Sequence, residues 1–220
     1  MLNEAAVIES TLINLQFARQ QGDEIIVVDG GSTDASVAIA RQYADKVIET
    51  STEEGRGRGA QMDRGVQQAS GNTLLFLHSD THLSRAAFDQ LERVAEEEDN
   101  CWGWFNIRLS GRSPMFRIIE KLINLRSRWS SIATGDQAIF VTQTLFAAVG
   151  GYRALPLMED VDLSKRLKAC HAPSPLSQTI ETSSRRWEER GVIRTVLLMW
   201  ALRLGFWMGV KPDRLQRLYR

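Results

Sequence analysis

Short apolar runs alternate with amphipathic stretches through the first hundred residues of the chain. The runs with the length and composition of buried strands lie at 24–29, 46–49 and 73–78. The stretches with apolar residues at helical spacing lie at 5–20, 32–43, 60–69 and 84–98. Strands that alternate with helices across short connections favour a parallel sheet covered by helices on both faces.

The alternation loosens after residue 100. The elements predicted there are strands at 102–109 and 136–141 and helices at 114–128, 159–169 and 190–209. The helix at 159–169 begins with acidic residues and ends with basic ones, which suits the helix dipole. The chain opens with a helix, whereas an α/β fold normally opens with a strand.

Charge divides the chain into a body at 1–184 and a basic arm at 185–220. The arm carries nine Lys and Arg residues against three acids, although the whole chain of 220 residues has a formal net charge of zero. Zero net charge argues against a general nucleic-acid binder, and a basic arm suits an anionic partner or surface. The alternative is that these charges only solvate a helical arm.

The apolar stretch at 190–210 permits two interpretations. It is too short and too charged to span a bilayer, which needs roughly 20 apolar residues. Trp200, Phe206 and Trp207 with flanking Arg residues suit a helix in the membrane interface. The other interpretation, which we favour here, is a helix packed on the body or on a second copy in a homodimer.

Two features bear on the compartment. Cys101 and Cys170 lie far apart and form no CxxC motif, which fits a reducing environment. The chain start shows no signal-peptide pattern. We therefore expect a cytoplasmic protein, with peripheral contact at the inner face of the membrane as the alternative.

Carboxylates stand where two of the predicted strands end. Asp29 follows one apolar run and Asp80 follows another, and the carboxyl ends of strands in an open α/β sheet form the ligand crevice. Asp80 can hold Mg²⁺ or Mn²⁺ through oxygen, leaving positions open for a diphosphate. Asp29 can hydrogen-bond a ribose or a base edge. Both residues are also ordinary turn formers.

Two further motifs suit a phosphorylated ligand. Arg56 and Arg58 alternate with glycines at 55–59, where backbone amides and guanidinium groups can approach phosphate. The loop does not match GxGxxG, which makes a dinucleotide dehydrogenase improbable. Glu159 and Asp160 start a predicted helix, either as a general base or as a complement to the helix dipole.

The order of these motifs resembles the inverting family-2 glycosyltransferases of GT-A fold. The Val-Asp-Gly-Gly-Ser-Thr-Asp of 28–34 is similar to the end of that family's first strand motif. Gln-Met-Asp-Arg-Gly at 61–65 and His-Ser-Asp at 78–80 resemble its Ala-Arg-Asn-x-Gly and Asp-x-Asp motifs with substitutions. Glu-Asp at 159–160 matches its catalytic motif, and 183–187 resembles its Gln-x-x-Arg-Trp motif with Ser183 where Gln would stand.

The resemblance implies an α/β GT-A fold with a mostly parallel central sheet flanked by helices and followed by the helical arm. Asn3 and Glu4 resemble the residues that end the family's opening strand, so that strand is expected to be missing from the body. Details at 57–62, 76–81 and 184–187 resemble a narrower bacterial subfamily labelled arsenosugar-biosynthesis or selenodomain-associated glycosyltransferases.

The resemblance also implies a reaction, in which a sugar moves from a UDP- or GDP-linked donor to an acceptor hydroxyl with inversion. Asp80 would bind the divalent metal, and Asp160 would be the general base. The substrate-binding residues implied are Asp29, Arg56, Arg58, Asp63, Glu159, Arg186 and Trp187. Trp187 either stacks on the acceptor or packs in the protein.

Two other functions stay open at this point. A sugar-1-phosphate nucleotidyltransferase uses a related scaffold, but the Glu159–Asp160 pair favours glycosyl transfer. A degenerate domain that binds a nucleotide sugar without catalysis would explain the altered motif at 78–80 and the absent opening strand.

Overall fold

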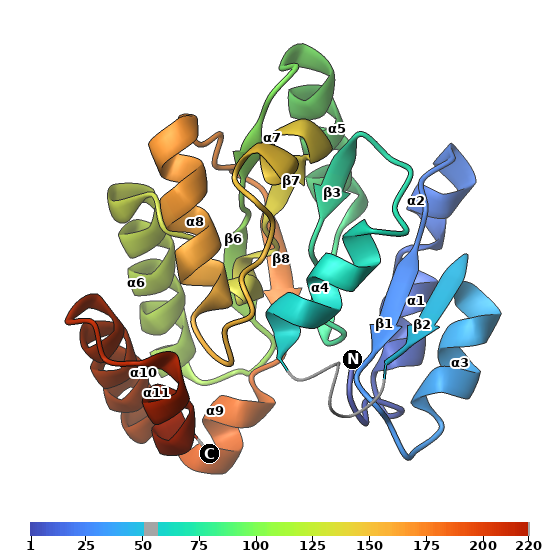
Figure 1. Ribbon diagram of the computed structural model, residues 1–220. Coiled ribbons are helices and arrows are strands. Elements are labelled where there is room, and N and C mark those ends of the chain that lie inside the picture. Colours follow the sequence, from blue (N-terminus) through green and yellow to red (C-terminus); the bar gives the residue numbers. More distant parts are fainter. Residues whose placement is uncertain (51–56, 220) are drawn as a thin grey trace.

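The chain is described by a computed structural model that covers residues 1–50 and 57–219. Arg56 and most of the glycine-rich loop lie outside these residues. Figure 1 shows two groups of elements, with the amino-terminal helices and two strands at one end and the carboxy-terminal arm at the other.

The amino-terminal group is a parallel pair of strands with three helices. Strands β1 (Ile26–Asp29) and β2 (Lys46–Glu49) pair in register, with Asp29 opposite Glu49. Its helices are α1 (Ile8–Asn14), α2 (Gln16–Gln21) and α3 (Ser36–Tyr43). The helix predicted at 5–20 is therefore two short helices, and the strands at 24–29 and 46–49 form where the apolar runs placed them.

Two further three-stranded sheets form the centre of the molecule. The first has the order β3 (Thr73–Leu75), β7 (Phe140–Thr142) and β5 (Trp102–Gly103), all antiparallel. The second has the order β4 (Thr81–His82), β8 (Thr179–Thr182) and β6 (Asn106–Leu109), with only β6 and β8 parallel. The pairing among the described strands is thus more antiparallel than their alternation with helices predicted.

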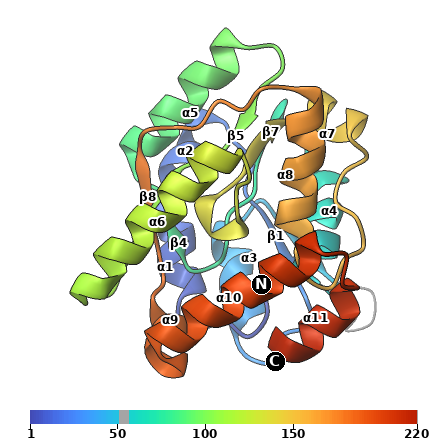
Figure 2. The same ribbon diagram turned by 90° about the vertical axis from the view of Figure 1, so that its left-hand side faces the viewer.

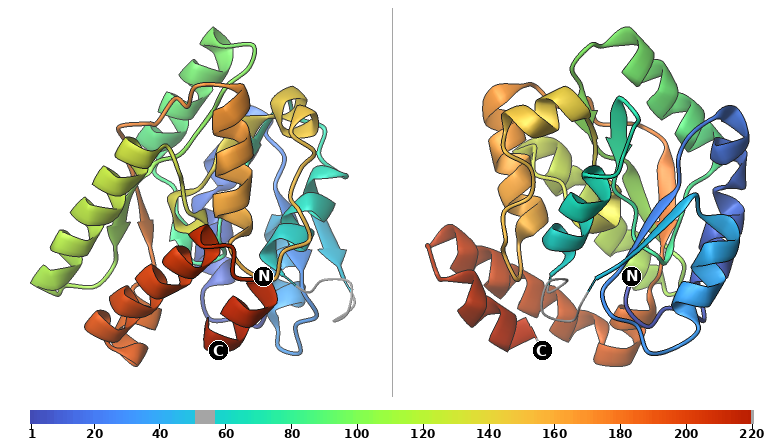
Figure 3. Two further views of the ribbon diagram at one scale, coloured as in Figure 1. Left: turned by 60° about the vertical axis from the view of Figure 1, so that its left-hand side comes forward. Right: turned by 45° about the vertical axis from the view of Figure 1, so that its right-hand side comes forward.

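Helices surround these sheets. They are α4 (Arg58–Val66), α5 (Arg85–Glu97), α6 (Pro114–Ser130), α7 (Gln143–Ala148) and α8 (Glu159–Cys170), with a short 3₁₀ turn η1 (Gly135–Gln137). The strand predicted at 136–141 is η1 followed by β7, which begins only at Phe140. Figure 3 shows α6 and α8 on the same side of the sheets.

The arm is three helices rather than one. They are α9 (Arg185–Arg190), α10 (Val192–Trp207) and α11 (Pro212–Tyr219). Gly191 and Gly209 separate them, at φ +82° and +84°, where a glycine has no steric penalty. The arm packs on the body, because Leu202 and Leu215 share a buried cluster with Met158 and Val161. None of the helices described is long and apolar enough to cross a bilayer.

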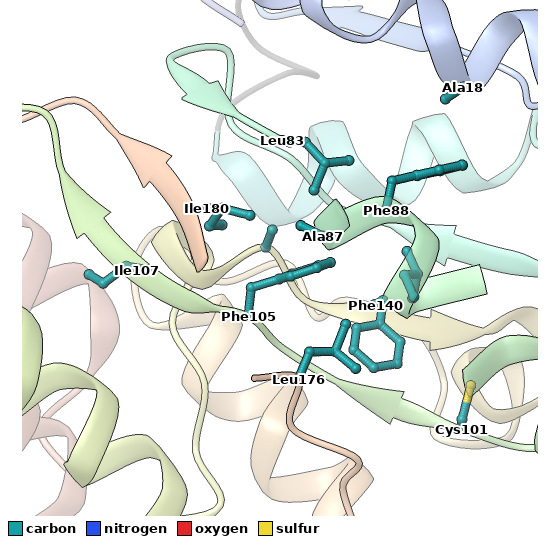
Figure 4. Packing of buried hydrophobic residues seen from close by; sticks show 12 residues of the cluster. Ala18, Leu83, Ala87, Phe88, Cys101, Phe105, Ile107, Phe140, Leu176 and Ile180 are labelled. Carbon is teal, nitrogen blue, oxygen red and sulfur yellow. The ribbon is translucent and has the colours of Figure 1, made fainter. Parts of the chain in front are cut away.

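The main hydrophobic core lies where α5 meets the two central sheets. Figure 4 shows its packing around Phe105, Phe140 and Ile180, all with no exposed surface. The rings of Phe105 and Phe140 meet edge to face, with centroids 6.2 Å apart. This core fixes β3 and β7, and therefore the segments that follow them toward the candidate site.

A cavity separates β1 from β3, which form no hydrogen-bonded pair in the described sheets. It has a volume of about 1630 Å³ and is lined by both strands and by α1. Met1 lies at its edge as a strand residue would, because its ammonium group donates to the Val28 carbonyl and its own carbonyl accepts the Gly30 amide. Where the opening strand was expected to be missing, the chain holds a single parallel bridge beside Asp29.

Phe140→Ala removes a ring from the centre of the core. We expect the free energy of unfolding to fall by roughly 3–5 kcal/mol, because the lost transfer energy adds to the cost of the cavity. Chemical denaturation measures the change. Leu218→Ala, at a side chain that is 67% exposed, is the matched control and should change stability by less than about 1 kcal/mol. An equal loss in both variants would contradict the assignment of the core.

Candidate active site

The first turn of α8 presents two acids. Met158 precedes them at φ +68°, a left-handed conformation that is costly for a side chain of this size. Its side chain is nevertheless buried in the cluster that joins α8 to the arm. Packing therefore holds the turn that sets the direction of Glu159 and Asp160.

Asp160 is held by two backbone amides. Gly135 N–H donates to its Oδ2 at 2.8 Å, and Val161 N–H donates to its Oδ1 at 2.7 Å. The first bond connects η1 to α8, so Gly135, which lies between α6 and β7, fixes the orientation of the Asp160 carboxylate. Each oxygen keeps a further acceptor site for another hydrogen bond.

His78 joins this group from the segment after β3. A Cβ on Gly135 would lie 2.7 Å from His78 Nε2, which is too close for an ordinary contact, and 3.8 Å from Asp160 Oδ2, so a larger residue would displace the imidazole. The opposite ring nitrogen, Nδ1, lies 3.4 Å from Asp136 Oδ1. His78 Nε2 is buried and has no hydrogen-bond partner among the described residues. The segment after β3, the turn η1 and the start of α8 thus meet at Gly135.

Arg126 of α6 adds a guanidinium group that sequence reasoning missed. It donates to Ser127 Oγ at 2.8 Å and to Gln137 Oε1 at 3.4 Å. Burial lowers its pKa to about 10, while the charges of Asp160 and Asp136 oppose that shift. A cation this close to the acid cluster offsets part of its negative charge.

Burial also governs the acids. It raises the pKa of Asp160, although the Gly135 and Val161 amides favour the charged carboxylate and oppose the shift. Burial, followed by repulsion from Asp160, raises the pKa of Glu159 to about 7, and the charges of Arg58 and His78 act against this. A base with a raised pKa accepts a proton more readily at neutral pH.

Two residues of this cluster, His78 and Asp136, also line the cavity between β1 and β3. Other charged and aromatic side chains that line it include Arg58, Asp80, Arg185 and Trp187. Arg58 starts α4 with its side chain exposed, where glycines allow the helix to approach Glu159. Asp80 and Asp136 thus face the same space from segments that are distant in sequence.

The carboxylates that line the cavity suit a divalent ion that takes most of its ligands from water and substrate. The described residues contain no group of three or more His, Cys, Asp and Glu side chains that could enclose a metal. Mg²⁺ commonly uses one or two carboxylates and takes its other ligands from water and substrate phosphates. Asp80, a carboxylate that lines the cavity together with His78, fits such an open site.

Asp29 and Asp63 take positions outside the cavity lining. Asp29 is 2% exposed, and its carboxylate accepts hydrogen bonds from Gly31 N–H, Ser32 N–H and Ser32 Oγ. Asp63 faces the turn before Tyr152 and accepts that residue's N–H at 3.3 Å. Both side chains are thus engaged in holding loops.

The remaining predicted residues belong to the glycine-rich loop and the arm. Arg56 lies outside the described residues, as does the side chain of Arg186. Trp187 both lines the cavity and packs against the cluster formed by Leu109, Phe116 and Ile119. Trp187 is therefore placed so that it can pack in the protein and still present part of its ring to the cavity.

Gly135 and Asp136 are the other residues that sequence reasoning missed as part of the site. Their signal is a Gly-Asp pair shortly before an apolar run, but the strand predicted at 136–141 takes Asp136 as its first residue and leaves Gly135 unassigned. Arg126 gave no signal, because one arginine in an amphipathic helix is usually a solvated residue.

Glu159→Gln should stabilise the free protein at neutral and higher pH. Because the native state holds this proton up to about pH 7 whereas the ordinary value is 4.5, native stability falls as the pH rises through that window. We expect a gain of roughly 3 kcal/mol above the window and little change below it. Thermal and urea unfolding across pH measure it, with exposed Glu97→Gln as control. A gain that does not depend on pH would contradict the titration of Glu159.

Known proteins resemble the chain in sequence. A PGL/p-HBAD biosynthesis glycosyltransferase of Mycobacterium bovis (strain BCG / Pasteur 1173P2) is 36% identical over 169 residues, which cover 69% of this chain and 60% of the relative. The poly-beta-1,6-N-acetyl-D-glucosamine synthase of Staphylococcus aureus (strain COL) is 29% identical over 75% of this chain and 43% of its own length. The chain therefore spans less than two thirds of these relatives.

Solved structures share the fold. The structure of S. aureus TarS 1-349 superimposes with a TM-score of 0.66 at 20% identity, covering 84% of this chain and 58% of that one. The mannosyltransferase PcManGT from Pyrobaculum calidifontis, solved with GDP-Man and Mn²⁺, gives a TM-score of 0.63 at 18% identity, covering 93% and 59%. The expected GT-A fold is confirmed.

A family model described as Glycosyl transferase family 2 matches residues 1–156, which is more than half of the chain. Together with the sequence relatives and the fold, this match shows that the chain belongs to glycosyl transferase family 2.

Proposed function

We propose that this chain transfers a sugar from a nucleotide-diphosphate sugar to an acceptor hydroxyl, with inversion at the anomeric carbon and Asp160 as the general base. The observation that carries the proposal is the convergence of Asp160, His78 and Asp136 around Gly135, beside a cavity mouth that also holds Asp80 and Arg58. A single basic group next to an open polar pocket is what one displacement reaction needs.

Neighbours of the same fold support the donor class. TarS was solved with UDP-GlcNAc and with UDP, and PcManGT with GDP-Man and Mn²⁺. These complexes leave uridine and guanosine both open as the nucleoside of the donor. The donor's diphosphate would lie at the cavity mouth, where Arg58 supplies positive charge and Asp80 a metal-binding oxygen.

Charge on the leaving group decides the rate of such a transfer. Mg²⁺ or Mn²⁺, when bound through Asp80, would neutralise charge on the diphosphate. Arg58 would act on the same phosphates from the start of α4, and Arg56 and Arg186 are further candidates for this role. Arg126 stabilises the negative charge of Asp160 in the state without a bound donor.

Asp160 would take the proton from the acceptor hydroxyl. As its oxygen accepts that proton, the hydroxyl oxygen forms a bond to the anomeric carbon, and the bond to the diphosphate breaks on the opposite face. The Gly135 and Val161 amides fix the carboxylate plane, which holds the base within hydrogen-bond reach of one acceptor position. Glu159, with its proton retained to about pH 7, would limit repulsion beside Asp160.

The other predicted site residues have roles consistent with this arrangement. Trp187 would offer a face to the acceptor at the cavity mouth. Asp29 and Asp63 would act by holding the loops that shape the nucleotide site. The narrower arsenosugar or selenodomain likeness and the cytoplasmic location stay predictions.

Asp160→Asn keeps the shape of the side chain and removes its capacity to accept a proton. We expect nucleoside diphosphate release from a panel of UDP-sugars and GDP-mannose to fall by about 10²–10⁴-fold. Donor binding, measured by calorimetry, should change by less than about threefold. Asp99→Asn, at an exposed position outside the cavity lining, is the control. Wild-type turnover in Asp160→Asn would overturn the base assignment.

Asp80→Asn tests the metal site separately. In the wild type, Mn²⁺ should tighten UDP or GDP binding, and the variant should lose most of that gain, about tenfold or more. Thermal shift and calorimetry with and without Mn²⁺ measure the difference, because a ligand of the native state raises the melting temperature. Asp89→Asn, an exposed acid of α5, is the control. Metal-dependent binding that survives in Asp80→Asn would contradict this assignment.

A further inference from the structure

Two helices expose apolar side chains along their whole length. On α6 the exposed residues recur every three or four positions, and they are Met115, Ile118, Leu122, Leu125 and Trp129. On α10 they recur in the same way, and they are Ile193, Leu197, Trp200, Leu204 and Trp207. Trp129 is 88% exposed and Trp207 is 76% exposed. Each helix thus carries an outward apolar stripe opposite the face that it packs on the body.

The two stripes concentrate the exposed apolar surface of the molecule. With Met208, which follows α10, they supply eleven of the fourteen large hydrophobic side chains that are exposed in the described part of the chain. The others are Leu2, Ile13 and Leu218. Single exposed apolar residues are ordinary, but contiguous ones mark a surface for protein or membrane contact.

The stripes belong to one surface. Val192 and Val196 of α10 pack against the cluster that Phe116 and Ile119 of α6 form with Leu109, so the helices touch where both begin. Figure 2 shows α6 and α10 together at the front of the same side of the molecule. We call this the α6–α10 surface, defined by the two stripes.

The charges of this surface have one sign. The two helices contain six Arg and Lys residues and one acid, Glu120. Glu120 is 8% exposed and is occupied by Arg117 and the Leu109 amide, so it contributes no outward charge. Lys121, Arg128 and Arg194 are exposed. A second copy of the chain would bring like charges together, whereas an anionic surface would attract them.

We propose that the α6–α10 surface docks on a membrane that contains anionic lipid. Its apolar stripes would enter the boundary between headgroups and acyl chains, and Lys121, Arg128 and Arg194 would meet the lipid phosphates. The three exposed tryptophans suit that boundary, because an indole ring is apolar with one polar N–H. The docking is peripheral, since none of the described helices can span the bilayer.

Vesicle co-sedimentation of the full chain tests the proposal. Vesicles of phosphatidylcholine mixed with phosphatidylglycerol should bind the protein, and vesicles of phosphatidylcholine alone should bind it much more weakly. Trp200→Ser with Trp207→Ser should weaken binding by about tenfold or more. Lys121→Ala with Arg194→Ala should weaken binding to the mixed vesicles by about fivefold per charge, and added salt should weaken the wild type in the same way.

Control variants outside the α6–α10 surface distinguish specific docking from nonspecific adsorption to the vesicles. Leu2→Ser with Ile13→Ser removes two apolar side chains outside the surface, each 52% exposed, and should leave binding unchanged. Arg41→Ala with Arg93→Ala is the corresponding charge control. Circular dichroism should show every variant folded.

Three outcomes would overturn the proposal. They are no binding to the mixed vesicles, binding that ignores lipid charge, and equal loss in the variants and their controls. A wild-type dimer in solution that the tryptophan substitutions dissociate would assign the surface to contact between copies, and would overturn it as well.

Discussion

The hydrogen bond from the Gly135 amide to Asp160 holds the candidate site together. It connects the turn η1, between α6 and β7, to the first turn of α8. Strand pairing does not join these two segments. Because Gly135 has no side chain, His78 can also lie against it. One hydrogen bond and the lack of a side chain at Gly135 therefore determine where Asp160, the His78 imidazole and Asp136 meet.

This arrangement places several charges in a space with little water. Burial disfavours the charged forms of Glu159 and Asp160, and the cluster is balanced by Arg126 below it and Arg58 at its mouth. Bound protons and guanidinium groups thus offset part of the negative charge of the cluster. Under the proposed function, an anionic diphosphate near Arg58 would change that balance and so link donor binding to the protonation of the acids.

Much of this fold follows from local sequence patterns. The apolar run that ends in Asp29 and the acidic start of the 159–169 helix lie where the sequence placed them, because both depend on neighbours along the chain. The β4 and β8 pairing and the contact of His78 with Gly135 depend on residues about a hundred or sixty positions apart, and periodicity carries no record of them. Arg126 escaped notice for the same reason.

The bridge between Met1 and Asp29 has a practical consequence. The chain enters the fold at Met1 in the direction of β1, and the space behind it is the apolar part of the cavity, lined by Ile26 and Val28. Residues fused ahead of Met1, such as an affinity tag, would have to pass through this space before reaching solvent. Helix α11 lines the same cavity through Asp213 and Gln216, so a handle for purification would need a flexible linker at either end of the chain.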